Sequence, residues 1–220
     1  MAQKPLKKLK RGVFITFEGP EGCGKSTHAR LLSEFLKKRS YGCVLTREPG
    51  GTRCGEKIRR ILLHSDGFEI SDLAELFLFE AARSQIVGEL ILPSLAKGKI
   101  VICDRFSDAT VCYQGYAGGI DLRAIETLNA IAAGGLKPEI TILLDVDTVT
   151  GLERAKAKGI DRMEKKELAY HKRVRAGYLK LAKRYPERIR VVRVAGDIDH
   201  TQALVRREVE LVIQRYKRTG

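Results

Sequence analysis

The residues that most constrain this chain are 19–26, which read Gly-Pro-Glu-Gly-Cys-Gly-Lys-Ser. They fit the pattern G-x-x-x-x-G-K-[ST], in which backbone N–H groups cradle phosphates. An apolar run, 13–17, comes before this segment, and residues 28–36 follow it with leucine and phenylalanine at helical spacing. A strand entering such a loop and a helix leaving it direct N–H groups and a helix N-terminus at one phosphate group. The sequence therefore predicts a site for a nucleoside triphosphate.

Polar residues in and near this loop have distinct predicted roles. Lys25 is expected to reach the β- and γ-phosphates, and the Ser26 hydroxyl to bind Mg²⁺. Asp104 follows the apolar run Ile100–Cys103, and an acid at the end of a buried strand orients Mg²⁺ directly or through water. We therefore expect a metal at Ser26 and Asp104. The predicted phosphate-binding set is Gly19, Pro20, Glu21, Gly22, Cys23, Gly24, Lys25, Ser26 and Thr27.

The composition indicates the number of domains and the cellular compartment to expect for this chain. Its 220 residues with 44% hydrophobic content suit one domain. The longest apolar stretches fall well short of the ~20 residues that span a bilayer, and no signal-peptide core follows the basic N-terminus. The five cysteines show no metal-binding spacing, and an odd count argues against a disulfide framework. We expect a cytoplasmic protein with no membrane partner.

The net charge of +14 is unevenly distributed. Residues 1–11 carry five basic residues and no acids, and residues 154–193 carry fifteen basic residues against four acidic ones. Such a field favours polyanions, whether nucleic acid or a small phosphorylated substrate. Residues 1–11 are predicted to be a disordered basic leader, and residues 12–220 a single domain.

Short β-rich runs alternate with longer helical patterns, which is typical of a parallel sheet wrapped by helices. The predicted fold class is α/β: three layers, with a parallel sheet of about five strands and helices on both faces. The predicted strands are Val13–Phe17, Cys43–Thr46, Ile100–Cys103, Ile140–Leu144 and Ile189–Val194. The predicted helices include residues 28–36, Leu73–Ala96, Ala124–Ala133, Thr148–Ala157, Lys166–Arg184 and His200–Tyr216.

Several polar segments follow strands, so the carboxyl edge of the sheet should form one ligand crevice. The phosphate loop, 46–48 and 104–105 all fall there, and two glycine-rich breaks, 49–51 and 115–119, are expected to be ligand loops. The planar fork of Arg105 suits phosphate oxygens. Phe79 and Arg83 are spaced to share one helix face, which fits either a nucleobase pocket or an ordinary core stripe.

Six segments together resemble the thymidylate kinase family over residues 12 to about 216. They are Phe-Glu-Gly-Pro-Glu-Gly-Cys-Gly-Lys-Ser-Thr (17–27), Thr-Arg-Glu-Pro-Gly-Gly-Thr (46–52), Glu75 to Arg83 with Phe-Glu-Ala-Ala-Arg, Asp-Arg-Phe (104–106), Tyr-Gln-Gly (113–115) and Leu-Asp-Val (144–146). The phosphate loop is shared by many nucleotide enzymes, whereas the segment 46–52 and the combined set are far more specific.

The resemblance implies a P-loop enzyme that transfers the γ-phosphoryl of ATP to dTMP, giving dTDP and ADP in dTTP biosynthesis, and a homodimer. By position it implies that Glu21 accepts the 3′-hydroxyl of dTMP, that Phe79 stacks on thymine and that Arg83 bonds O4. Tyr113 would crowd the 2′ position, Thr110 and Gln114 would contact the base, and three arginines would surround the acceptor phosphate. The implied dTMP set is Glu21, Arg47, Arg59, Phe79, Arg83, Arg105, Thr110, Tyr113 and Gln114.

Residues 154–162 correspond to a short basic lid. Gly22 follows Glu21, which resembles bacterial family members that supply catalytic cations from the lid. Charge on a transferring phosphoryl group must be neutralised. Arg154 and Arg162 are the first choices for the cation that does so, and Lys158 is the next. The expected catalytic set is Lys25, Arg105, Arg154 and Arg162.

Two other functions fit the phosphate loop. One is a kinase of another nucleoside monophosphate or of a deoxynucleoside, which would need a base pocket different from the one that Phe79, Arg83 and Tyr113 imply. The other is a P-loop switch or nucleic-acid-binding ATPase, which the charge would suit. The chain has no guanine-recognition motif and no aromatic-rich platform for single strands, so no specific nucleic-acid binding is expected.

Overall fold

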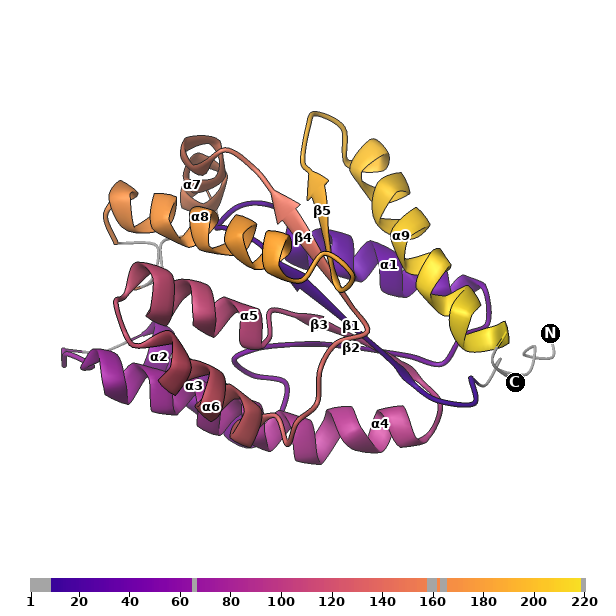
Figure 1. Cartoon of the computed structure of the whole chain (residues 1–220), viewed down its shortest axis with the longest axis horizontal. Coiled ribbons are helices and arrows are strands. Elements are labelled where there is room, and N and C mark those ends of the chain that lie inside the picture. Colours follow the sequence, from indigo (N-terminus) through magenta and orange to yellow (C-terminus); the bar gives the residue numbers. More distant parts are fainter. Residues whose placement is uncertain (1–8, 65–66, 158–161, 163–165, 219–220) are drawn as a thin grey trace.

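A parallel five-stranded sheet runs through the protein in the order β2-β3-β1-β4-β5 (Figure 1). The computed structural model describes residues 9–64, 67–157, 162 and 166–218. Each predicted strand is confirmed, with its end within one residue of the prediction. The strands are β1 (Val13–Glu18), β2 (Cys43–Arg47), β3 (Ile100–Asp104), β4 (Ile140–Asp145) and β5 (Ile189–Arg193).

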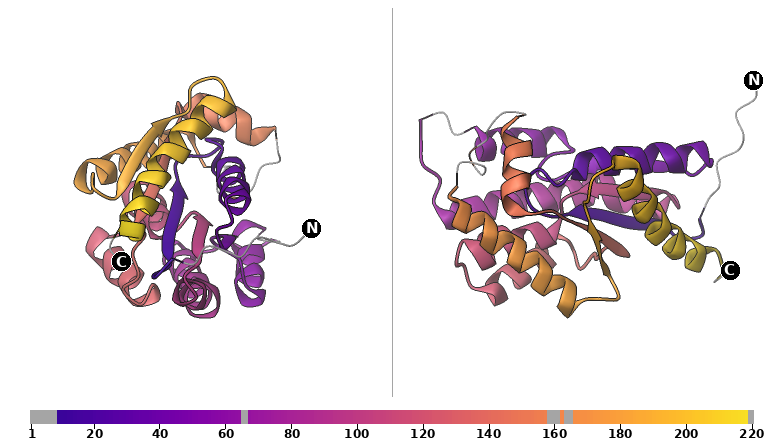
Figure 2. Two further views of the ribbon diagram at one scale, coloured as in Figure 1. Left: turned by 90° about the vertical axis from the view of Figure 1, so that its right-hand side faces the viewer. Right: turned by 90° about the horizontal axis from the view of Figure 1, so that it is seen from above.

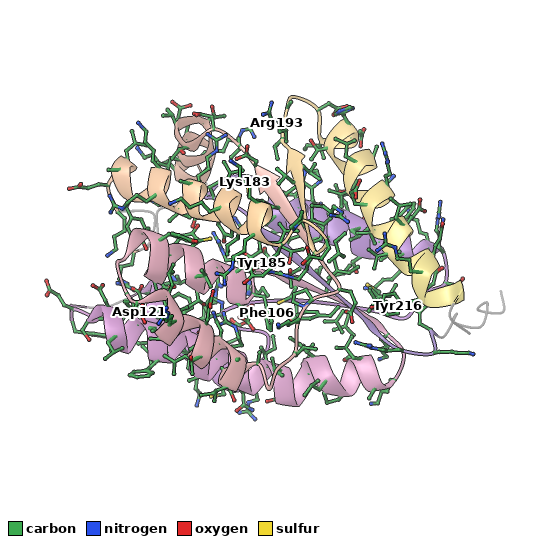
Figure 3. All side chains as sticks on the ribbon, in the orientation of Figure 1. Phe106, Asp121, Lys183, Tyr185, Arg193 and Tyr216 are labelled. Atoms are coloured by element: carbon green, nitrogen blue, oxygen red, sulfur yellow. The ribbon has the colours of Figure 1, made fainter. Side chains whose placement is uncertain are left out.

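Both faces of the sheet are covered, which explains why its central strands read as continuous apolar runs. All six residues of β1 are buried. Because successive side chains of a strand point to opposite faces, Val13 and Ile15 pack in one apolar cluster, while Phe14 packs in another. Phe106, labelled in Figure 3, packs in the same cluster as Phe14, and the two rings meet edge to face with their centroids 4.9 Å apart.

The helices form a layer on each face, so the predicted three-layer arrangement is confirmed (Figure 2). Two helices, α1 (Lys25–Lys38) and α9 (Ile198–Arg218), pack on each other and on one face. The other face is covered mainly by α4 (Leu92–Ala96), α5 (Ser107–Thr110), the π-helical η2 (Val111–Ala117) and α8 (Leu168–Arg184). The remaining helices are α2 (Arg53–Leu63), α3 (Asp72–Ile86), α6 (Leu122–Ala132) and α7 (Thr148–Lys156).

The helix predicted over Leu73–Ala96 is interrupted. It consists of α3, a π-helical segment η1 (Val87–Ile91) and α4. Pro93 stands at the start of α4 and has no N–H to donate to the carbonyl one turn earlier. The wider π-helical turn just before it is a way to continue the helix without that hydrogen bond. The prediction of one regular helix was wrong in this respect.

The predicted ligand loop at 115–119 is also corrected. Gly115, Tyr116 and Ala117 belong to η2, and the chain turns only at Gly118 and Gly119. A Cβ at Gly115 would lie 2.5 Å from the Leu122 side chain. The glycine there permits close packing of η2 on α6, a need that composition alone does not separate from a flexible loop.

The last residues of the predicted leader contact the domain. Leu9 is buried in the cluster under α1 and α9, and its N–H donates to the Gly98 carbonyl at 3.4 Å. Arg11 pairs with Glu139 at 3.0 Å. Residues 1–8 lie outside the described part of the chain. Within the described part, no helix has the length and apolar character that crossing a membrane requires.

Candidate functional site

The phosphate loop is a tight turn between β1 and α1. Gly19, Gly22 and Gly24 have φ values of 142°, 65° and 91°, in a region that other residues rarely occupy. Lys25 begins α1, and its ammonium donates to the carbonyl oxygens of Gly19 (3.1 Å) and Pro20 (2.8 Å). The lysine therefore lies against the loop that the sequence assigns to phosphate binding.

The loop also touches α7 backbone to backbone. A Cβ at Gly22 would lie 1.8 Å from the Gly151 carbonyl oxygen, and a Cβ at Gly151 would lie 2.4 Å from the Glu21 carbonyl oxygen. No side chain fits at either position without moving the backbone. This contact explains why glycine follows Glu21, and it joins the phosphate loop to the helix that leads into the predicted lid.

The two predicted metal ligands meet. β3 pairs with β1 so that Asp104 is opposite Phe17, at the end of the strand that enters the loop. There the Asp104 carboxylate accepts a hydrogen bond from the Ser26 hydroxyl. The described residues contain no group of three or more His, Cys, Asp or Glu side chains arranged for a metal. This sparse oxygen set fits Mg²⁺, which takes its other ligands from phosphates and water.

Arg105 follows β3 directly and holds the site together. Its φ is 70°, which turns its side chain back over the phosphate loop. The guanidinium donates to Glu21 (2.7 Å) and the Tyr113 hydroxyl (2.9 Å), and at longer range to the Gly19 carbonyl (3.3 Å) and the Tyr178 hydroxyl (3.2 Å). These partners come from the loop, η2 and α8, so one side chain joins three separate segments.

Glu21 is held ionised by this arrangement. Burial opposes its charge, but Arg105, Lys25 and the Tyr113 hydroxyl, which donates to it at 2.6 Å, outweigh that effect and lower its pKa to about 2. A half-buried carboxylate that accepts hydrogen bonds is the partner that a sugar hydroxyl needs. The geometry therefore suits the role that the family resemblance implies for Glu21.

Glu18, at the end of β1, belongs to the same group of contacts and was not predicted. It is fully buried and accepts from the Phe106 N–H and from the Tyr178 hydroxyl, both at 2.7 Å. Burial and the nearby Asp108 raise its pKa to about 8, although Arg105 and the two hydrogen bonds act in the opposite direction. Its sequence signal is an acid as the last residue of a buried strand. We call Glu18, Glu21, Arg105, Tyr113 and Tyr178 the Arg105 cluster.

One cavity of about 300 Å³ brings the predicted residues together. It is lined on one side by the phosphate loop and Asp104, and on the other by Phe79 and the residues around it. All nine residues of the dTMP set that the family resemblance implies line it: Glu21, Arg47, Arg59, Phe79, Arg83, Arg105, Thr110, Tyr113 and Gln114.

Arg83 is more enclosed than its helix position suggested. Its side chain is 2% exposed and donates to Glu48, Glu80 and Asn129, and to the Thr110 hydroxyl at 3.0 Å. Two buried acids beside one guanidinium cannot both be fully compensated, and burial raises the pKa of Glu48 to about 7. A base oxygen that binds Arg83 must therefore share an N–H group with one of these partners. The Thr110 hydroxyl, which carries no charge, is one partner with which an N–H group could be shared.

The predicted lid cations lie away from the cavity lining. Arg154 is exposed on α7. Arg162 donates to the Leu62 carbonyl at 2.9 Å and to the Glu75 carboxylate, on the side of α2 and α3. Residues 158–161 and 163–165 lie outside the described residues, and Lys158 is among them. The catalytic roles of Arg154 and Arg162 stay predictions.

Comparison with known proteins agrees with this geometry. The family model "Thymidylate kinase" matches residues 17–205. The chain belongs to the thymidylate kinase family. A curated thymidylate kinase from Roseiflexus sp. is 48% identical over 200 residues, covering 85% of this chain and 88% of its own. One from Citrifermentans bemidjiense is 46% identical over 216 residues, covering 95% of each.

A solved structure extends the similarity to the fold. The crystal structure of thymidylate kinase from Ehrlichia chaffeensis has a TM-score of 0.75 and 36% identity, covering 91% of this chain and 99% of its own. The predicted P-loop fold and family are confirmed. Membership of the thymidylate kinase family supports a phosphotransferase rather than a nucleic-acid-binding ATPase.

Glu18→Gln should flatten the pH dependence of stability. The folded-state pKa of Glu18, about 8, lies above the ordinary value of 4.5. Its contribution to folding is therefore complete below about pH 4.5 and is lost as the pH rises through about 8. Chemical denaturation across this range should show a loss of unfolding free energy in the wild type that shrinks in the variant. Glu48, whose raised pKa acts with the same sign, keeps the slope from vanishing.

The control for this measurement is Glu34→Gln, at an exposed position on α1 where the carboxylate pairs with Arg30 among the described residues. It should retain the wild-type slope. Equal slopes in the wild type and Glu18→Gln would contradict the account of Glu18.

Proposed function

We propose that this protein transfers the γ-phosphoryl group of ATP to dTMP, giving dTDP and ADP. The observation that carries the proposal is that one cavity is lined both by the phosphate loop and by every residue of the dTMP set that the family resemblance implies. Donor and acceptor phosphates must be held in line and close together for transfer. Lys25, Arg105 and Tyr113 all line this cavity, and Lys25 and Arg105 both donate to the Gly19 carbonyl, so cations for the two phosphates lie close together.

Mg²⁺ would be held by Ser26 and, directly or through water, by Asp104. When bound, the ion neutralises charge on the donor phosphates. Lys25 lies in the same loop, so it can exchange its two carbonyl partners for phosphate oxygens at little structural cost. Of the two predicted lid cations, we propose that Arg154 adds a further positive charge there, because Arg162 is paired with Glu75.

The acceptor needs positioning more than activation, because a phosphate oxygen is already a nucleophile. Arg47, Arg59 and Arg105 would surround the dTMP phosphate. In the structure Arg47 pairs with the exposed Glu56 on α2, and Arg59 donates to the Pro49 carbonyl in the turn after β2. Arg105 is held by its hydrogen bonds to Glu21 and to the hydroxyls of Tyr113 and Tyr178. A dianion would thus meet cations whose positions are already restricted.

Selection against ribose gives a direct test. Tyr113 is 5% exposed, and its ring packs edge to face on Tyr170 and Tyr178 while its hydroxyl binds Glu21. Tyr113→Phe keeps the ring and removes only the hydroxyl, whereas Tyr113→Ala removes the bulk at the 2′ position. We expect the preference for dTMP over its ribonucleotide counterpart to survive in Tyr113→Phe and to fall by about 10-fold or more in Tyr113→Ala.

The measurement is ADP release with Mg-ATP and a panel of pyrimidine and purine monophosphates. A wild-type preference for cytidine or adenosine monophosphate would contradict the dTMP proposal and favour a kinase of another nucleoside monophosphate. Equal ribose discrimination in Tyr113→Ala and the wild type would contradict the role of Tyr113.

We also propose a homodimer in the cytoplasm. Large apolar side chains are exposed on neighbouring helices, with Ile61 on α2 at 41% and Leu73 and Phe77 on α3 at 53% and 50%. Burying such a patch in a second copy is favourable, since exposed apolar patches mark interfaces. All five cysteines are free thiols, which suits a reducing compartment.

Phe77→Glu should convert the dimer to a monomer, because a charge at the centre of an apolar interface is costly to bury. Sedimentation velocity checks this, and Glu89→Gln, at an exposed position on η1, is the control. A wild-type protein that sediments as a monomer at micromolar concentration would contradict the dimer.

A further inference from the structure

Gln114 on η2 forms part of a wall between two cavities. It lines both the 300 Å³ cavity and a smaller one of about 190 Å³ behind it, whereas Glu75 on α3 lines only the smaller one. Both side chains are 4% exposed. The Gln114 amide nitrogen donates to Glu75 Oε1 at 2.8 Å, and the other oxygen of Glu75 accepts from Arg162.

This pairing fixes which end of the amide faces Glu75. A carboxylate only accepts hydrogen bonds, so it must meet the NH₂ group of Gln114 and not its oxygen. The Arg162 guanidinium only donates hydrogen bonds, so it likewise meets an acceptor oxygen of Glu75. The Gln114 Oε1 accepts no hydrogen bond from a described residue and is not among the buried unpaired atoms. Because the amide nitrogen is turned toward Glu75, which lines the smaller cavity and not the larger one, the oxygen is the end of the amide that is left to meet a ligand in the larger cavity.

We propose that Glu75 is a positioning residue that orients the Gln114 amide and thereby selects a 4-keto pyrimidine. The inference rests on the proposed function, in which Gln114 and Arg83 contact the base. A 4-keto pyrimidine presents an N3–H donor beside an O4 acceptor. The Gln114 oxygen accepts from N3–H and the Arg83 guanidinium donates to O4. A 4-amino pyrimidine presents the reverse pair, so both contacts become repulsive.

Glu75→Gln should reverse the orientation of Gln114. The Arg162 guanidinium can only donate, so it draws the oxygen of the new amide and leaves that amide's NH₂ group facing Gln114. Gln114 must then turn its own oxygen toward position 75 and present its NH₂ group to the base. We expect the ratio of kcat/KM for dTMP to that for dCMP to fall by about 10- to 100-fold, with dTMP efficiency reduced and dCMP efficiency raised.

A matched control spans the junction of α3 and η1. Gln85 donates to Glu89 at 2.7 Å, an exposed glutamine–glutamate pair of the same chemistry. Glu89→Gln should leave the ratio unchanged. A Glu75→Gln enzyme that is folded by its thermal transition and keeps the wild-type ratio would overturn the inference.

A second variant keeps the test decisive if Glu75→Gln does not fold. Gln114→Met keeps the length of the side chain and removes the amide, so it should also lower the ratio by about 10-fold or more. An unchanged ratio in Gln114→Met would equally overturn the inference. The proposed function fails separately, if the wild-type enzyme phosphorylates no pyrimidine monophosphate or does not prefer dTMP over dCMP.

Discussion

The ion pair between Arg105 and Glu21 is the interaction on which the arrangement of this site depends. The two side chains are 18% and 15% exposed and lie 2.7 Å apart. Arg105 follows β3 and Glu21 lies in the phosphate loop after β1, so the pair fixes the loop against the neighbouring strand. The hydroxyls of Tyr113 and Tyr178 extend the same contacts to η2 and α8. The donor and acceptor sides of the cavity are thereby held in one orientation.

Burying these charges is unfavourable for stability, and the structure offsets that cost with hydrogen bonds. Glu21 keeps a low pKa because cations and a hydroxyl surround it, whereas Glu18, only three residues earlier, has a raised pKa because burial and Asp108 dominate. Neighbouring acids with opposite shifts are typical of functional sites. The strained φ of Arg105 fits the same interpretation, since a positive φ at a residue other than glycine persists where its surroundings fix it.

Much of the fold could be predicted because its signals are local. Strand positions follow from short apolar runs, and the phosphate loop fixes the start of α1. The cavity lining could be predicted because the family motifs locate residues such as Phe79 and Gln114 by their order in the chain. The π-helical segments could not be predicted, because helical periodicity does not distinguish a π-helical turn from an α-helical one. At η1 the turn precedes Pro93, and at η2 it goes with the close packing of Gly115 on α6.

The supporting residues could not be predicted because their contacts join distant parts of the chain. Tyr178 is 160 positions from Glu18, and nothing in the pattern of α8 distinguishes this tyrosine from a core residue. Glu75 resembles a solvated acid in the first turn of a helix until η2 and Arg162 are placed beside it. The sequence therefore locates the residues that line the cavity better than those that hold them in position.

A double-mutant cycle of Arg105→Lys and Tyr178→Phe on kcat for dTMP tests most directly whether Arg105 acts through a position that the protein fixes. Lysine keeps the charge but lacks the planar fork, so Arg105→Lys should lower kcat by about 10²-fold. Tyr178→Phe removes one of its anchors and should lower kcat by about 10-fold in the wild type, but hardly at all once Arg105 is lysine. Strictly additive effects, or a Tyr178→Phe enzyme with full activity, would contradict the account.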